Sequence, residues 1–194
     1  MWSMDVKTKQ KELKKIDQEI ATCPICPVDK IGVPVPGEGN PDADIVFIGE
    51  APGKTESVTG RPFVGRSGKL LRSNIIRIGL LEDDVYITSP VKYLPKRGTP
   101  TPADIAHGRE HLMKQLDIID PKIIVLMGRV AAEGVLQEKV SVTKLHGTSI
   151  EKDGRQYFFM YHPAAAIRFT KFRKTFEDDF NTLKLLTKEH KSEK

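Results

Sequence analysis

The sequence has very little cysteine and no long apolar segment. Its 194 residues include only two cysteines, Cys23 and Cys26, so a disulfide framework is excluded and a reducing, intracellular setting is expected. No apolar run approaches the ~18 residues that a membrane-spanning helix needs. Residues 1–20 are rich in lysine and lack the apolar stretch of a signal peptide. We therefore expect a cytoplasmic protein without a membrane contact.

The charge balance is mildly basic. Lysine and arginine number 31 against 26 acidic residues, which gives a formal net charge of +5. This excess permits a nucleic-acid partner without requiring one. The 39% hydrophobic content excludes disorder throughout the chain, and the length fits a single domain over residues 1–194.

Short apolar runs alternate with helical patterns along the chain. The runs predict strands at 44–49, 85–88, 122–127 and 157–160. Apolar residues at helical spacing predict helices at 4–20 and 67–78, and the pair Thr101-Pro102 fits the N-cap and first residue of a helix at 101–119. Further helices are expected at 128–136 and 171–188, and the last residues, 187–194, form a charged tail. This alternation predicts a three-layer α/β/α fold with a central four-stranded, mostly parallel sheet.

Three of the predicted strands end in unusual loops. These loops are residues 49–53, 88–92 and 161–164. In open parallel sheets the ligand lies outside the carboxyl ends of the strands, so we expect the three loops to converge around a ligand.

The glycine-rich stretch 49–69 suits close approach of the backbone to a ligand. It lacks both the Walker lysine motif and the Gly-x-Gly-x-x-Gly pattern, which speaks against an unrelated nucleotide-phosphate-binding protein. Phe63 within it is either a stacking platform for a base or an apolar anchor of the loop.

Two further features stand near the end of the sequence. His162 directly follows a strand and precedes Pro163, so it is either a donor or base at a ligand or a structural loop residue. Four cations then occur without an intervening acid, interleaved with aromatic rings: Arg168, Lys171, Arg173 and Lys174. They contact phosphates or form a solvated helix start, although cations at a helix N-terminus oppose its dipole.

Three segments carry a resemblance to a known family. Gly49-Glu-Ala-Pro-Gly53, Gly60-Arg-Pro-Phe-Val-Gly65 and His162-Pro-Ala-Ala165 resemble the signature motifs of the family 4 uracil-DNA glycosylases. The similarity extends over about residues 23–186. It implies hydrolytic removal of uracil, or a related deaminated base, from DNA during base excision repair, by a protein that acts as a monomer.

The resemblance also implies roles for individual residues. Catalytic residues would be Glu50 and Ala51 through their backbone, Glu56 as an acid that positions water, and His162 as a donor to the uracil O2. The base would be bound by Gly49, Phe63 and Ser89. The DNA would be held by a phosphate site at Ser67 and Gly68, a wedge at Ile167 and Arg168, and the cations Lys92, Lys171, Arg173 and Lys174.

The cysteines depart from the family pattern. Four cysteines bind a [4Fe–4S] cluster in that family, but Tyr93 and Gly108 stand where the third and fourth would fall. Cys23 and Cys26 are then a remnant metal-binding pair, and we expect no cofactor. His107 and His111 lie one helical turn apart and could complete a zinc site. We interpret the four residues as free thiols and surface histidines, while a cluster and a zinc ion stay open.

Ser89 is the second departure, because the family has an asparagine there that reads the uracil edge. A hydroxyl is shorter than an amide and can rotate, so the exact base specificity stays open. An alternative function follows from the two departures: a catalytically weak protein that binds DNA or a damaged base.

Overall fold

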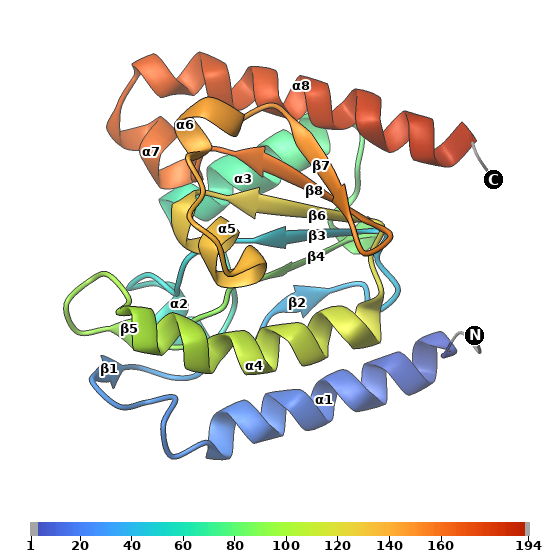
Figure 1. Ribbon diagram of the computed structural model, residues 1–194. Helices are drawn as coiled ribbons and strands as arrows, with labels where there is room; N and C mark the ends of the chain where they lie inside the picture. Colours follow the sequence, from blue (N-terminus) through green and yellow to red (C-terminus); the bar gives the residue numbers. More distant parts are fainter. Residues whose placement is uncertain (1–3, 193–194) are drawn as a thin grey trace.

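The computed structural model describes residues 4–192 (Figure 1). Its main sheet has six strands in the order β2-β4-β3-β6-β8-β7. The four inner strands are parallel and are those that the apolar runs predict: β4 (Val85–Thr88), β3 (Ile45–Ile48), β6 (Ile123–Met127) and β8 (Arg155–Met160). The α/β class and the mostly parallel sheet are confirmed.

Two antiparallel edge strands and a separate two-stranded sheet were not predicted. The edges of the main sheet are β2 (Glu38–Gly39) and β7 (Ser149–Lys152), and the small sheet pairs β1 (Lys30–Ile31) with β5 (Leu94–Pro95). These strands are two to four residues long, and none of them is apolar throughout. They therefore lack the apolar runs by which the inner strands are recognised.

Both faces of the sheet are covered by helices, which explains why its inner strands are mostly apolar. Ile45 and Phe47 point to one face and Val46 and Ile48 to the other. The Phe47 face packs against α3 (Arg66–Arg77), α7 (Pro163–Arg168) and α8 (Lys171–Ser192). The opposite face packs against α4 (Pro102–Ile119) and α5 (Arg129–Leu136), and α1 (Val6–Thr22) lies on α4 (Figure 1).

The helix boundaries follow from local capping. Thr101 accepts a hydrogen bond from the N–H of Asp104, and the Asp104 carboxylate accepts one from the N–H of Thr101, so a capping box begins α4. Helix α8 continues through most of the predicted charged tail as far as Ser192, while residues 193–194 lie outside the described part. Three short turns complete the fold: α2 (Glu56–Thr59), η1 (Glu82–Asp84) and α6 (Val142–Leu145). Within residues 4–192 no helix has both the length and the apolar content to cross a membrane.

Candidate functional site

A cavity of about 390 Å³ opens at the carboxyl ends of the parallel strands. Glu50 follows β3, Ser89 follows β4 and His162 follows β8, and all three line this cavity. The expected convergence of the three loops is therefore confirmed. Other residues of the wall come from the glycine-rich stretch, among them Ala51, Glu56, Phe63 and Ser67.

His162 is held in one orientation and one protonation state. It caps α7, and its Nδ1 accepts a hydrogen bond from the backbone N–H of Ala164 at 3.1 Å. Burial lowers the pKa of His162 to about 4, so the ring is neutral near pH 7. A neutral imidazole that accepts at Nδ1 carries its proton on Nε2. The cavity therefore has a neutral N–H donor at Nε2.

Phe63 lies beside His162, with 5.8 Å between the ring centroids. Its backbone has a φ of +53°, which is rare for a residue with a bulky side chain. Two glycines make room for it. A Cβ on Gly49 would lie 2.4 Å from the Phe63 ring, and a Cβ on Gly68 would lie 1.9 Å from the Phe63 carbonyl oxygen. Gly68 thus allows α3 to pack closely on the Phe63 backbone.

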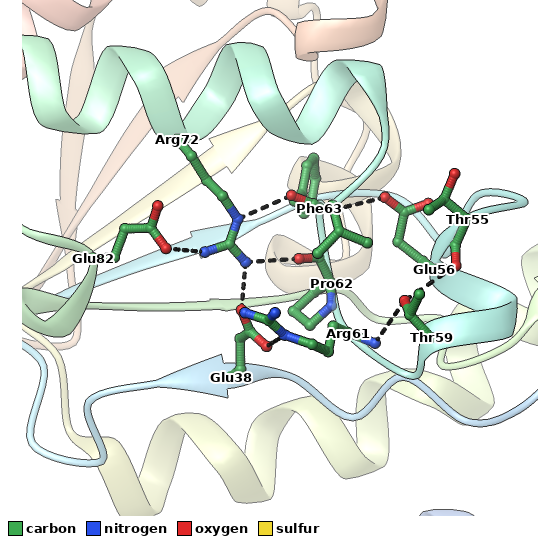
Figure 2. A network of polar contacts seen from close by, with 10 residues as sticks. Glu38, Thr55, Glu56, Thr59, Arg61, Pro62, Phe63, Arg72 and Glu82 are labelled. Atoms are coloured by element: carbon green, nitrogen blue, oxygen red, sulfur yellow. Dashed lines mark hydrogen bonds and ion pairs between the residues drawn. The ribbon is translucent and has the colours of Figure 1, made fainter.

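Polar contacts fix the unusual backbone of this loop (Figure 2). Arg72 on α3 donates to the carbonyl oxygens of Phe63, at 3.0 Å, and of Pro62, at 2.9 Å. Its guanidinium also pairs with Glu38 and Glu82. Arg61 makes a second pair with Glu38. The sequence analysis missed Arg72 and Glu38, because contacts to backbone carbonyls leave no motif.

These contacts shift the pKa of Glu38. Burial alone would raise the pKa of Glu38, but hydrogen bonds from Arg61 and Arg72 hold it below its usual range. The carboxylate is therefore charged at neutral pH and keeps both arginines in place.

The two acidic residues of the cavity are engaged differently. Glu56 is buried, and its Oε1 accepts hydrogen bonds from the N–H groups of Val64, at 2.9 Å, and Gly65, at 2.7 Å. One carboxylate oxygen thus supports the Phe63 loop, and only Oε2 remains for a ligand or water. Glu50 is half-buried, and burial raises the pKa of its carboxyl while Arg129 opposes the shift.

Ser89 is buried and its hydroxyl is already used in part. Its Oγ donates to the carbonyl oxygen of Val91 at 2.9 Å. Since the single hydroxyl proton points to Val91, the oxygen can only accept from a molecule in the cavity.

Lys92 does not lie on the surface, so its expected contact with DNA is a wrong prediction. Its side chain is 2% exposed, and its Nζ donates to Pro36 O, Thr88 Oγ1 and Gln115 Oε1 at 2.7–2.9 Å. Burial lowers its pKa to about 7. Lys92 instead links the end of β4 to α4.

Of the other residues predicted to contact DNA, Gly68 is buried, Ser67 lines the cavity, and those of α7 and α8 are exposed. Ile167 and Phe169 are exposed apolar residues, 36% and 45% accessible, at the end of α7. The Arg168 guanidinium lies over the Phe169 ring at 5.3 Å. The exposed cations Lys171, Arg173 and Lys174 begin α8, where the first turn contains no acid, and Arg173 pairs with Glu177.

The α/β/α sandwich thus places a neutral histidine donor and an aromatic ring at the carboxyl ends of its parallel strands. The family model of the uracil DNA glycosylase superfamily matches residues 36–184. This segment includes every residue named above as lining the cavity.

Similar proteins identify the family within this superfamily. The chain is 38% identical over 181 residues to the type-4 uracil-DNA glycosylase of Archaeoglobus fulgidus, covering 88% of this chain and 91% of the relative. It is 40% identical over 185 residues to that of Sulfurisphaera tokodaii, covering 90% and 84%. The relative from Thermotoga maritima is 38% identical, with 83% and 86% covered. The chain belongs to the type-4 family of the uracil-DNA glycosylase superfamily.

The iron–sulfur cluster that the resemblance implies does not fit these residues. Such a cluster needs four thiolates, and the sequence has two cysteines. Tyr93 is buried against Ile16, Ile20 and Cys26, where it fills the space next to the cysteine pair. A Cβ on Gly108 would lie 2.0 Å from the carbonyl oxygen of Pro90, so helix and loop leave no room for a fourth cysteine.

Cys23 and Cys26 instead lie beside two histidines of α4. His107 Nε2 is 3.2 Å from Cys23 Sγ and 3.4 Å from Cys26 Sγ, and His111 belongs to the same group. Although burial opposes it, hydrogen bonds from the N–H groups of Cys26 and Ile25 and from His107 lower the pKa of Cys23 to about 7. His111 is buried, so the interpretation of both histidines as surface residues is wrong for it.

Proposed function

We propose that this protein excises uracil, or a related deaminated base, from DNA by hydrolysis of the N-glycosidic bond. The observation that carries the proposal is the neutral Nε2–H donor of His162 beside the Phe63 ring in a cavity at the strand ends. The cavity volume of about 390 Å³ is within the range of small-molecule sites.

The base enters the cavity after the nucleotide flips out of the stack. Phe63 stacks on the ring, and the backbone at Gly49, Glu50 and Ala51 meets its carbonyl edge. Because Arg72 and Glu56 fix the Phe63 loop before DNA binds, the stacking surface is already in position.

The reaction breaks the bond between the sugar C1′ and the base nitrogen, and the electron pair leaves with the base. His162 Nε2–H donates to O2 of the departing uracil anion and stabilises charge that develops in the transition state. A neutral imidazole can fill this role near pH 7, since it donates through the Nε2 proton that it already carries and needs no prior protonation. Water held by the Glu50 and Ala51 backbone and by Glu56 Oε2 then adds to C1′ and leaves an abasic sugar, and the proton that the water releases neutralises the uracil anion.

The surrounding surface holds the DNA. Ser67, near the N-terminus of α3, receives a phosphate, with Gly68 allowing the close packing of that helix turn. Ile167 and Arg168 fill the gap that the flipped nucleotide leaves. Lys171, Arg173 and Lys174 contact the backbone phosphates. We propose that the enzyme acts as a monomer in the cytoplasm, where DNA is accessible to it.

Base specificity depends on Ser89. An amide offers a donor and an acceptor side by side, whereas the Ser89 oxygen only accepts, because its proton is directed to Val91. Uracil presents both a donor and an acceptor on that edge, and one hydroxyl matches only the donor. We therefore include hypoxanthine and xanthine among the candidate substrates.

The test is an assay with labelled oligonucleotides that contain uracil, hypoxanthine or xanthine, single-stranded and double-stranded. We expect cleavage of uracil DNA that leaves an alkali-labile abasic site. His162→Ala should lower the rate by about 10²–10³-fold, the usual loss for one donor to a developing anion. His190→Ala is the matched control, since His190 contacts Gln156 near the start of β8, away from the cavity.

Absence of activity on all three bases would contradict the enzyme and favour the catalytically weak, base-binding alternative. An unchanged rate in His162→Ala would contradict the role of His162 alone.

A further inference from the structure

The strongest unexplained feature is the group of Cys23, Cys26, His107 and His111. One ligand atom from each residue lies within 4.8 Å of all the others. The two cysteines follow α1 directly, and the two histidines lie four residues apart on α4, so they face the same side of that helix. Two segments 81 residues apart thus bring four metal-binding side chains together.

His111 gives an independent sign of a ligand. Its side chain is among the buried ones, at 7% exposure, yet neither ring nitrogen has a hydrogen-bond partner in the described structure. Leaving a buried polar group unpaired destabilises the folded state, and such groups are rare in folded proteins. A metal ion bound to one nitrogen removes this cost.

We propose that Cys23, Cys26, His107 and His111 bind one zinc ion in a closed structural site. Two thiolates and two imidazoles are a tetrahedral zinc ligand set. Bond lengths of ~2.3 Å to sulfur and ~2.0 Å to nitrogen place such ligand atoms ~3.3–3.8 Å apart. The observed separations of 3.2 and 3.4 Å between His107 Nε2 and the two sulfurs lie close to this range, and all four ligand atoms lie within 4.8 Å of one another, so small side-chain shifts bring them around a single ion.

The surroundings support a closed site. Glu19 Oε2 lies 4.0 Å from His111 Nδ1 and is held by Lys114, so a small shift lets it accept the Nδ1 proton of a metal-bound imidazole. Tyr93, Ile16 and Ile20 cover the other side of the cysteines. Four protein ligands leave no open position for a substrate, so the ion stabilises the fold and takes no part in glycosidic bond cleavage.

The proposed zinc site takes the place of the family's iron–sulfur cluster but holds a different metal with different ligands. It links the end of α1 to α4, and this inference does not depend on the proposed glycosylase activity.

Metal analysis of the purified protein tests the proposal. We expect about one zinc per chain and no stoichiometric iron. Cys26→Ser and His111→Gln should lose most of the zinc, while His190→Gln and Tyr93→Phe should retain it. Tyr93→Phe is the closer control, because it changes a neighbour that supplies no ligand. A strong chelator should lower the melting temperature of the wild type more than that of either ligand variant.

Because a ligand variant can fail to fold, reconstitution of the metal-free wild type with Co²⁺ is the second measurement. Tetrahedral cobalt bound by two thiolates should give intense visible absorption that zinc removes. The proposal is overturned by a wild-type protein without zinc, by a brown iron-containing protein, or by zinc that both ligand variants retain.

Discussion

At the scale of single residues, His162 shows how a helix cap can select the tautomer of a neutral histidine. The Ala164 N–H occupies Nδ1, and burial keeps the ring neutral. The same hydrogen bond that begins α7 therefore fixes the proton on Nε2, facing the cavity.

This arrangement predicts a pH dependence of stability. The pKa of His162 falls from an ordinary 6.5 to about 4 in the folded protein, so between these values the unfolded chain binds a proton that the folded protein does not. The free energy of unfolding should therefore fall as the pH decreases from 6.5 to 4. His162→Asn keeps a capping side chain without a titrating group and should lose less stability in this interval. Urea unfolding of both proteins at several pH values measures the difference, and parallel curves would refute it.

Ser89 gives a prediction on specificity. Ser89→Asn supplies an amide that can donate and accept, and we expect the kcat/KM for uracil DNA to rise about tenfold, as one added hydrogen bond of ~1–1.5 kcal/mol would give. Ser89→Ala is the control, since it removes the contact with Val91 without adding an amide. Equal rates for the two variants would show that position 89 does not read the base.

Phe63, Ser89 and His162 could be predicted as site residues, because strand ends and glycine-rich loops can be recognised from local sequence. The burial of Lys92 could not be predicted in this way. Its three acceptors come from positions 36, 88 and 115, which only the folded chain brings together. A lysine in a proline-rich loop looks exposed until its acceptors are known.

At the scale of elements, the Phe63 loop depends on α3 more than on its own sequence. Arg72 donates to two consecutive carbonyls of the loop, while Arg77, one and a half turns further on, contacts Glu177 and Asn181 on α8. Arg72 therefore holds the Phe63 loop, whereas Arg77 on the same helix holds α8.

Arg72→Ala should lower the free energy of unfolding by about 2–3 kcal/mol, because it leaves two carbonyls without their donor and leaves Glu38 with Arg61 alone. It should also lower the rate of uracil excision, since Phe63 loses its fixed position. Arg77→Ala should lower stability without a comparable loss of rate. Denaturant unfolding and the oligonucleotide assay together separate the two effects, and equal losses of rate would contradict the role of Arg72.

The inner strands of the sheet could be predicted because burial on both faces requires continuous apolar runs. The edge strands β2 and β7 could not be predicted. They begin at Glu38 and Ser149 and are short, partly exposed segments without that pattern. The pair Thr101-Pro102 predicts the start of α4. The end of α8 could not be predicted, because it lies among charged residues that contain no helix-terminating glycine or proline.

At the scale of the whole molecule, α7 begins at the cavity, since His162 caps it and Ala164 lines the wall, and it ends at the exposed Ile167 and Arg168. Ile167→Ala and Arg168→Ala should lower the rate on double-stranded uracil DNA by about tenfold and change the rate on single strands little, because only a duplex must be held open after flipping. Leu185→Ala on α8 is a control for loss of an exposed apolar side chain. Equal losses on both substrates would argue against a wedge.

The loop that carries Phe63 is held by contacts within the protein itself. Glu56 and Arg72 fix its rare backbone conformation, and the glycines at 49 and 68 make room for it. Its conformational entropy is therefore lost when the chain folds and not when DNA binds. The binding energy that the enzyme gains from its substrate remains available for the one deformation still required, which is that of the duplex.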